Sequence, residues 1–279
     1  MTRKCLTLFC LGLLLLTVSA AKAARIDTLS VESPKMKKNI EVLVIVPDQC
    51  KASAPCPTVY LLHGYGGNAR SWLKLKPELP QMADADGIIV VCPYGENSWY
   101  WDSPLQTGSQ FETFVSSELV NYIDSHYPTV ADRRARAITG FSMGGHGSMW
   151  LSIRHKDIFG AGGSMSGGVD IRPFPDNWDM KKQLGEEAAN QGRWDAHTAI
   201  NQLDRLKDGD LAMIIDCGTE DFFYDVNLKF HQALAERGIH HDFISRPGVH
   251  NEAYWNNSMD YQWLFFKKFF NGYRDTPVK

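Results

Sequence analysis

A serine between two glycines could provide a nucleophile. Ser142 is the middle residue of the segment 140–144, which has the pattern G-x-S-x-G. A strand-like run precedes it at 136–139 and a helix-like run follows it at 144–155. In that context the pattern forms a sharp turn that exposes the serine hydroxyl beside the unpaired N–H groups of a helix start. We therefore predict that Ser142 is a catalytic nucleophile; the alternative is an ordinary glycine-rich turn.

A serine hydroxyl needs a base, and His250 is the best candidate. It follows the strand-like run 242–245 through a short loop, so we expect it at the same edge of the sheet as Ser142. His146 lies on the helix that follows Ser142, and we interpret it as a structural or pocket-lining residue. Six other histidines fall in predicted helices or at strand entrances and are interpreted as surface or packing residues: His126, His155, His197, His231, His240 and His241.

A carboxylate that orients the base is expected at the end of another strand. Asp221 follows the strand-like run 211–216 after a short turn. From there it could hold His250 in the productive tautomer and stabilise the imidazolium. Two acids compete with it: Asp216 is still inside the strand, whereas Glu220 is adjacent to Asp221 and spacing alone does not separate the two. The chain order Ser, Asp, His is that of α/β hydrolases.

A second glycine-rich segment could stabilise negative charge. The loop 63–67, with the sequence His-Gly-Tyr-Gly-Gly, follows the strand-like run 58–62. Its glycines allow the backbone to approach a substrate closely. We predict that the backbone N–H groups of Tyr65 and Met143 form an oxyanion hole, and that His63 fixes the loop by hydrogen bonding. The alternative is a plain glycine-rich turn.

Strand-like and helix-like runs alternate along the chain. Apolar runs typical of strands lie at 26–31, 40–46, 58–62, 87–92, 136–139, 160–164, 211–216 and 242–245, and helical spacing occurs at 111–127, 144–155, 226–236 and 259–270. The first two strands are predicted to pair antiparallel, and the others are continuously apolar, as central parallel strands are. The predicted fold class is α/β, a mostly parallel sheet with helices on both faces. The segment 169–199 is predicted to be an inserted loop or small helical cap over the carboxyl edge.

The first 23 residues are predicted to be a secretory signal peptide. A positive start is followed by the apolar run 6–18 and by small residues that would allow cleavage after Ala21 or Ala23. The run is shorter than the about 20 residues that a membrane span needs. We therefore expect residues 24–279 to form a single exported domain, secreted or periplasmic.

Cysteine usage agrees with export. Cys50 and Cys56 flank a short loop and are predicted to form a local disulfide, the alternative being two free thiols. Cys92 and Cys217 lie in apolar runs and are predicted to be buried strand residues.

Length and charge limit the possible functions. The chain has 279 residues, 44% of them hydrophobic, which fits one large domain better than two small ones. A net charge of −3 gives no electrostatic footprint for nucleic acid. The sequence has no CxxC pair and no histidine-rich cluster, so we expect neither a metal nor another cofactor. It makes no prediction of oligomeric state.

Aromatic residues near the predicted site could bind substrate. The segment 99–101 follows the strand-like run 87–92, and Tyr254 and Trp255 follow His250. Exposed tryptophan and tyrosine side chains stack on sugars or phenolic rings. We predict substrate contacts from Trp101, Tyr254 and Trp255; the alternative is that these aromatics pack loops onto the core.

Four segments together resemble the esterase D-like branch of the α/β hydrolases: 63–67, 140–145, 218–221, and 247–251 with Tyr254 and Trp255 after it. This branch includes carbohydrate esterase family 1 feruloyl and acetylxylan esterases, S-formylglutathione hydrolases and mycolyltransferases. The resemblance extends over residues 27–270 and implies the α/β-hydrolase fold. It implies that the family's nucleophile, acid and base correspond to Ser142, Asp221 and His250, and its oxyanion donors to Tyr65 and Met143. Several relatives carry tryptophan two residues after the catalytic histidine, where this chain has Glu252.

The resulting hypothesis is an exported serine carboxylic-ester hydrolase that forms an acyl-enzyme. Export and the resemblance suggest that it removes feruloyl or acetyl groups from plant polysaccharides. Alternatives are an acyltransferase, or a thioesterase like S-formylglutathione hydrolase, which the signal peptide argues against because that thioester is cytosolic. A non-catalytic carbohydrate-binding relative is a further alternative, and the complete Ser142–His250–Asp221 set argues against it.

Overall fold

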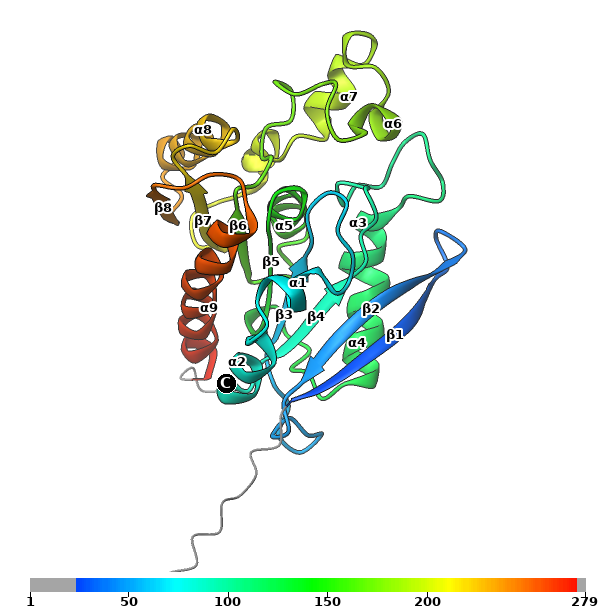
Figure 1. Cartoon of the computed structure of the whole chain (residues 1–279), viewed down its shortest axis with the longest axis vertical. Coiled ribbons are helices and arrows are strands. Elements are labelled where there is room, and N and C mark those ends of the chain that lie inside the picture. The colour runs from blue at the N-terminus through cyan, green and yellow to red at the C-terminus, as the bar shows by residue number, and fades with distance from the viewer. Residues whose placement is uncertain (1–23, 275–279) are drawn as a thin grey trace, which may run out of the picture.

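An eight-stranded sheet forms the centre of the molecule (Figure 1). The computed structural model describes residues 24–274, so the signal peptide predicted at 1–23 lies outside the described residues. The strands are β1 (Arg25–Ser33), β2 (Lys38–Val46), β3 (Thr58–Leu62), β4 (Ile89–Pro93), β5 (Arg136–Gly140), β6 (Ala161–Met165), β7 (Ala212–Gly218) and β8 (Asp242–Arg246). They lie in the order β1-β2-β4-β3-β5-β6-β7-β8. The pairs β1–β2 and β2–β4 are antiparallel and the remaining pairs are parallel, which confirms the predicted mostly parallel sheet.

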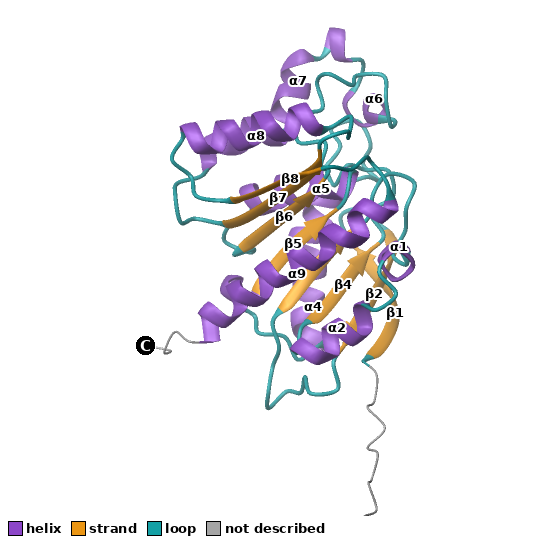
Figure 2. Ribbon diagram, turned by 60° about the vertical axis from the view of Figure 1, so that its left-hand side comes forward, coloured by secondary structure: helices purple, strands orange, loops and turns teal. Residues whose placement is uncertain are grey.

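Helices cover both faces of the sheet (Figure 2). One face carries α1 (Ser71–Leu75), α2 (Leu79–Asp86) and α9 (Glu252–Arg274), and the other carries α3 (Phe111–Thr113), α4 (Val120–His126), α5 (Met143–Arg154) and α8 (Tyr224–Glu236). Within β3, Val59 and Leu61 pack in the core on the face of α1, α2 and α9, whereas Tyr60 and Leu62 pack in the core on the opposite face. Successive side chains of a strand point to opposite faces, so burial on both faces explains the continuous apolar runs.

The interruption predicted at 169–199 is a small insertion with short helices. It contains α6 (Met180–Leu184), a 3-10 turn (Glu187–Ala189) and α7 (Gln191–Ala196), and a second 3-10 segment (Ala199–Arg205) leads back toward β7. Figure 1 shows α6 and α7 at the top of the molecule, beyond the sheet. The predicted small cap is therefore confirmed.

Three helical regions differ from the prediction. α9 begins at Glu252 instead of residue 259, because buried Tyr254 and Trp255 continue its apolar stripe past a polar stretch that hid it. α1 and α2 were not predicted, since they are short and α2 has a proline in its first turn, where the missing N–H costs nothing. Between α3 and α4 the helix contains a π-helical segment (Phe114–Leu119). Within residues 24–274, no helix has the length and apolarity to cross a bilayer.

The loop between β2 and β3 contains the predicted disulfide. Cys50 and Cys56 are bonded, while Cys92 and Cys217 are buried free thiols in β4 and β7. The Cys56 N–H also donates to Pro128 O at 2.8 Å, which ties this loop to the segment after α4. The disulfide therefore lies at the amino edge of the sheet, where β3 begins.

Replacing both Cys50 and Cys56 by alanine is expected to lower the free energy of unfolding by roughly 2 kcal/mol, because a closed loop this short removes little freedom from the unfolded chain. For a domain of this size the melting temperature should fall by about 4–8 °C. Scanning calorimetry with and without reductant measures the effect. The reduced wild type should match the double variant, and equal melting temperatures for oxidised wild type and variant would contradict the expectation.

Candidate active site at the carboxyl edge of the sheet

Ser142 occupies a strained turn between β5 and α5. Its φ is 57° and its ψ is −119°, a conformation that non-glycine residues rarely adopt and that proteins retain at functional turns. Gly140 and Gly144 allow the turn, because a Cβ at either position would collide with the carbonyl of Leu62 at the end of β3. α5 therefore begins directly against β3, and Ser142 faces a cavity at this edge.

His250 and Asp221 complete a chain of hydrogen bonds with the serine. His250 Nε2 lies 2.9 Å from Ser142 Oγ, and His250 Nδ1 lies 2.8 Å from Asp221 Oδ2. The Asp221 side chain is 0% exposed and that of His250 is 14% exposed. When Nδ1–H donates to the carboxylate, Nε2 keeps a lone pair for the serine proton. The geometry is that of a nucleophile, a base and an orienting acid, each at the carboxyl end of a strand.

The two competing acids have other partners. Asp216, inside β7, accepts a hydrogen bond from Tyr254 Oη at 2.5 Å and forms an ion pair with Arg246 at 3.1 Å. Burial raises the pKa of Asp216 despite these partners. Glu220 accepts a hydrogen bond from the N–H of Gly248, and so fixes the loop that carries His250. Among the three acids, the contacts with His250 are made by Asp221.

The loop 63–67 packs against the serine turn. A Cβ at Gly64 would lie 2.6 Å from the Phe141 ring and 3.4 Å from Ser142 Cβ, so the loop reaches the nucleophile closely. His63 Nδ1 donates to Gly64 O at 2.7 Å, and its Nε2 accepts from Gly95 N–H at 2.8 Å. Burial lowers the pKa of His63 to about 4, so the ring is neutral. His63 thus fixes the loop by hydrogen bonding, as predicted.

The two predicted oxyanion donors lie on either side of this contact. Met143 is the first residue of α5, where a backbone N–H has no carbonyl one turn earlier in the helix. Around the serine turn, the backbone N–H groups of Ser142, Gly144 and His146 donate to the carbonyls of Met165, Phe141 and Ser142, respectively. Tyr65 lines the cavity together with Ser142. The two donors thus belong to the two segments that meet beside Ser142, and their binding of an oxyanion stays a prediction.

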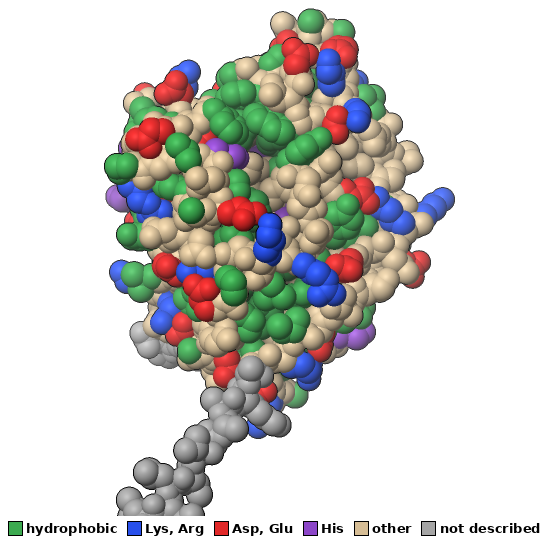
Figure 3. All heavy atoms as spheres, viewed as in Figure 1, with side chains coloured by type: hydrophobic (Ala, Val, Ile, Leu, Met, Phe, Trp, Pro, Cys, Tyr) green, Lys and Arg blue, Asp and Glu red, His purple; other side chains and the backbone are tan. Residues whose placement is uncertain are grey.

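Aromatic side chains flank the cavity at Ser142, which has a volume of about 670 Å³. Trp178, from the insertion, stacks on Phe222 at 5.6 Å between ring centroids, and Phe222 lies 4.2 Å from the His250 ring. On another side Trp255 stacks on Phe141 at 4.6 Å. Figure 3 shows hydrophobic side chains gathered beside a histidine in the upper half of this face. The polar part of the lining includes Asn68, Arg70, Ser71, Lys74 and Glu252.

Trp101 and Tyr254 are not where a substrate contact requires them, and these two predictions are corrected. Trp101 is 0% exposed and stacks on Trp99 at 5.7 Å, because the positive φ angles of Trp99 and Tyr100 turn this segment into the core. Tyr254 is buried with its hydroxyl on Asp216. Of the three predicted contacts, Trp255 lines the cavity.

The stacked pair of Phe222 and Trp178 is a part of the cavity wall that the sequence analysis missed. Phe222 directly follows Asp221, and 50% of its surface is exposed. Its position beside a predicted triad member was the available signal. Trp178 lies in the irregular insertion, where no periodic pattern places a side chain.

His146 has the structural role that its helix position predicted. It is buried between Trp99 and Trp101, and its Nδ1 lies 3.0 Å from Gly168 O. Burial lowers the pKa of His146 to about 3. The residue therefore packs α5 beneath the insertion and does not face the serine hydroxyl.

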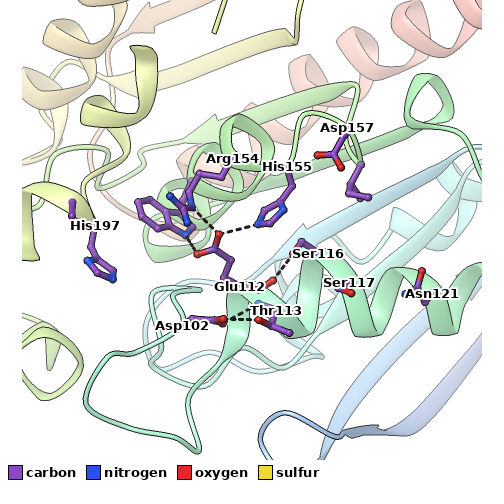
Figure 4. A pocket seen from close by; sticks show the side chains of 13 residues that line it. Asp102, Glu112, Thr113, Ser116, Ser117, Asn121, Arg154, His155, Asp157 and His197 are labelled. Atoms are coloured by element: carbon purple, nitrogen blue, oxygen red, sulfur yellow. Dashed lines mark hydrogen bonds and ion pairs between the residues drawn. The ribbon is translucent and has the colours of Figure 1, made fainter. Parts of the chain in front are cut away.

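A second cavity, of about 760 Å³, contains an ion-pair cluster in place of a nucleophile and base (Figure 4). Glu112 Oε1 accepts from Arg154 Nε at 2.7 Å and from His155 Nε2 at 2.8 Å, and its Oε2 accepts from Trp150 Nε1 at 2.9 Å. Burial alone would raise the pKa of Glu112, but the hydrogen bonds from His155 and Arg154 lower it. The His155 ring is therefore engaged with a carboxylate, whereas the hydrogen-bonded serine, histidine and aspartate lie at the other cavity.

Known proteins resemble this chain over most of its length. A family model described as "Putative esterase" matches residues 33–266. An acetyl esterase from Caldicellulosiruptor saccharolyticus is 24% identical over 260 residues, covering 83% of this chain and 95% of that protein. An endo-1,4-beta-xylanase/feruloyl esterase from Xylanibacter ruminicola is 36% identical over 122 residues, covering 40% of this chain and 17% of that protein. The solved structure of a ferulic acid esterase matches with a TM-score of 0.76 and 26% identity, covering 89% of this chain and 100% of that one.

The two buried neutral histidines, His63 and His146, make stability depend on pH. Their folded-state pKa values, about 4 and about 3, lie below the unfolded value of 6.5. Between these values the unfolded chain binds more protons, so the free energy of unfolding should fall as pH drops from 6.5 to 4. Urea unfolding followed by tryptophan fluorescence measures this slope.

The variant His146→Gln separates this effect from carboxylate titration. Glutamine keeps an N–H donor for Gly168 O but has no proton to gain, so the slope between pH 6.5 and 4 should become shallower. An identical slope in wild type and variant would show that His146 is not held neutral by the fold.

Proposed function

Because the chain belongs to the Esterase family and has the α/β-hydrolase fold, we propose that it is an exported serine esterase that forms an acyl-enzyme on Ser142. The observation that carries the proposal is the hydrogen-bond chain from Ser142 Oγ through His250 to buried Asp221. Export is supported by the signal-peptide pattern at the start of the sequence.

The proposed reaction has two steps, formation of the acyl-enzyme and its hydrolysis, and His250 transfers protons in both. Ser142 Oγ attacks the ester carbonyl while His250 Nε2 takes its proton, and Asp221 stabilises the imidazolium. The N–H groups of Tyr65 and Met143 bind the oxyanion. His250 then protonates the departing alcohol, and water, deprotonated by His250, hydrolyses the acyl-enzyme.

The proposed substrates are feruloyl or acetyl esters of plant polysaccharides. A cavity of about 670 Å³ is far larger than an acetyl group and is flanked by two stacked aromatic pairs, Trp178–Phe222 and Phe141–Trp255. Such surfaces suit a planar phenolic acyl group. The similarity to an acetyl esterase, to a xylanase/feruloyl esterase and to a ferulic acid esterase supports the same substrate classes.

Three alternatives remain open to experiment. An acyltransferase would use the same triad but pass the acyl group to a sugar hydroxyl in place of water. A thioesterase of the S-formylglutathione type would need a cytosolic substrate, against which the signal-peptide pattern argues. A non-catalytic carbohydrate-binding relative would release no acid from any ester. Product analysis with methyl ferulate, acetylated xylan and a glutathione thioester separates these cases.

Ser142→Ala or His250→Ala is expected to lower turnover by at least about 10³-fold without unfolding the protein, because only binding and the oxyanion hole remain. Asp221→Asn should cost less than loss of Ser142, since it leaves nucleophile and base in place. Glu220→Gln is the matched control, because Glu220 neighbours Asp221 but contacts Gly248. Steady-state rates on an aryl acetate, with melting temperatures as the folding check, measure all four variants.

Two outcomes would contradict the assignment. Near-normal turnover in Ser142→Ala would show that Ser142 is not the nucleophile. A larger loss in Glu220→Gln than in Asp221→Asn would mean that the wrong acid has been chosen.

Trp255→Ala and Phe222→Ala are each expected to raise KM for methyl ferulate roughly 5- to 10-fold, because a good stacking contact contributes on the order of 1 kcal/mol. KM for a small alkyl acetate should change much less, since that ester cannot reach both aromatic walls. Tyr261→Ala removes an aromatic ring that is exposed outside the cavity and serves as control. Equal losses on both esters would mean that the rings support the fold and do not select the acyl group.

A further inference from the structure

The insertion is tied to the oxyanion loop beside the cavity. Tyr65 Oη donates to Asp179 Oδ2 at 2.7 Å, across a sequence separation of 114 residues. Tyr65 and Trp178, the residue before Asp179, both line the cavity at Ser142. This hydrogen bond therefore links two walls of the cavity, one from the β3–α1 loop and one from the insertion.

Asp179 is held in an unfavourable backbone conformation at this point. Trp178 and Asp179 have φ angles of 49° and 56°, and two consecutive non-glycine residues in the left-handed region persist only where surrounding contacts impose them. Those contacts are present: Trp99 Nε1 donates to Trp178 O at 3.2 Å, and Lys182 forms an ion pair with Asp179 at 2.9 Å. The insertion thus presents the Asp179 carboxylate to Tyr65 from a fixed position.

The oxyanion loop has fixed points on both sides of Tyr65. His63 bonds to Gly64 O, and Asn97 Oδ1 accepts from Gly66 N–H at 2.8 Å. Tyr65 is 37% exposed, so packing alone restrains its side chain weakly. Its phenol is restrained by Asp179. The peptide unit that carries the Tyr65 N–H is held at Gly64 O, which accepts from His63 Nδ1 and from Gly67 N–H. The hydrogen bond to Asp179 adds a restraint from the insertion on the side chain of the same residue.

We propose that Asp179 is a positioning residue that, through the phenol of Tyr65, holds the oxyanion loop in its catalytic conformation. The inference rests on the proposed function, because it presupposes that the Tyr65 N–H binds the oxyanion. Asp179 touches no reacting atom. Its effect is to keep one N–H donor aimed at the oxygen that becomes negative in the transition state, where a small misplacement is expensive.

The test compares Tyr65→Phe, which removes one hydroxyl, with Asp179→Gly, which removes the carboxylate while glycine accepts the positive φ without strain. Each should lower kcat on an aryl acetate roughly 10-fold, less than the 10²- to 10³-fold of losing an oxyanion donor completely, with KM within about 2-fold of wild type. Affinity for a boronic acid that forms a tetrahedral adduct on Ser142 should fall by the same factor. The double variant should have the same kcat as the single variants, because both changes remove the same hydrogen bond between Tyr65 and Asp179.

Two further variants complete the design. Asp179→Asn should recover most of the rate, because asparagine tolerates the left-handed region and keeps an acceptor oxygen. Lys181→Ala removes ion pairs of the same helix with Asp176 and Glu186, which do not involve Asp179, and should leave kcat unchanged.

The outcomes are distinguishable from failure of the proposed function itself. If Ser142→Ala retained wild-type turnover, the esterase mechanism would be wrong and this inference with it. If Ser142→Ala were inactive but Tyr65→Phe had wild-type kcat and boronate affinity, the inference alone would be overturned. Multiplicative losses in the double variant would also overturn it. Tyr65→Phe carries the test by itself if Asp179→Gly does not fold.

Discussion

The contact between the first turn of α5 and the last residue of β3 is the constraint on which the site depends. No side chain fits between Gly144 and the Leu62 carbonyl, so the helix can start only where the strand ends. The nucleophile turn and the loop after β3 are then forced together, with Gly64 against Phe141. Ser142, the Met143 N–H and the Tyr65 loop become neighbours as a result of backbone packing. Without that contact, nothing in the backbone would hold the serine turn and the loop after β3 together.

Much of this arrangement was predictable because it follows from local rules. Strands buried on both faces are continuously apolar, so β3, β5 and β7 were located within a few residues. Residues that follow such strands must meet at the carboxyl edge, which is why the serine of the G-x-S-x-G pattern, His250 and an acid after β7 could be proposed as one site. Their mutual hydrogen bonds are the structural counterpart of that argument.

The substrate side of the site was predicted less well, because it depends on how irregular segments fold back. Nothing in the residues 99–101 reveals that positive φ angles turn Trp101 inward, where it packs with His146. Nor does sequence pattern place Trp178, in an insertion without periodicity, next to Phe222. Spacing alone did not decide between Glu220 and Asp221, which the resemblance separated, since adjacent acids on one loop differ only in which way each side chain faces.

The separation of the reactive groups along the chain has a consequence for how the protein acquires activity. Ser142 and His250 are 108 residues apart, and the acid joins them from yet another loop. Contacts between distant parts of a chain carry a larger loss of loop-closure entropy than local contacts and slow folding. β8 is an edge strand added beyond β7, and the loop after it carries the base. Ester hydrolysis therefore requires β8 to be docked on β7, so that the onset of catalysis during refolding reports the native topology and not the collapse of the core.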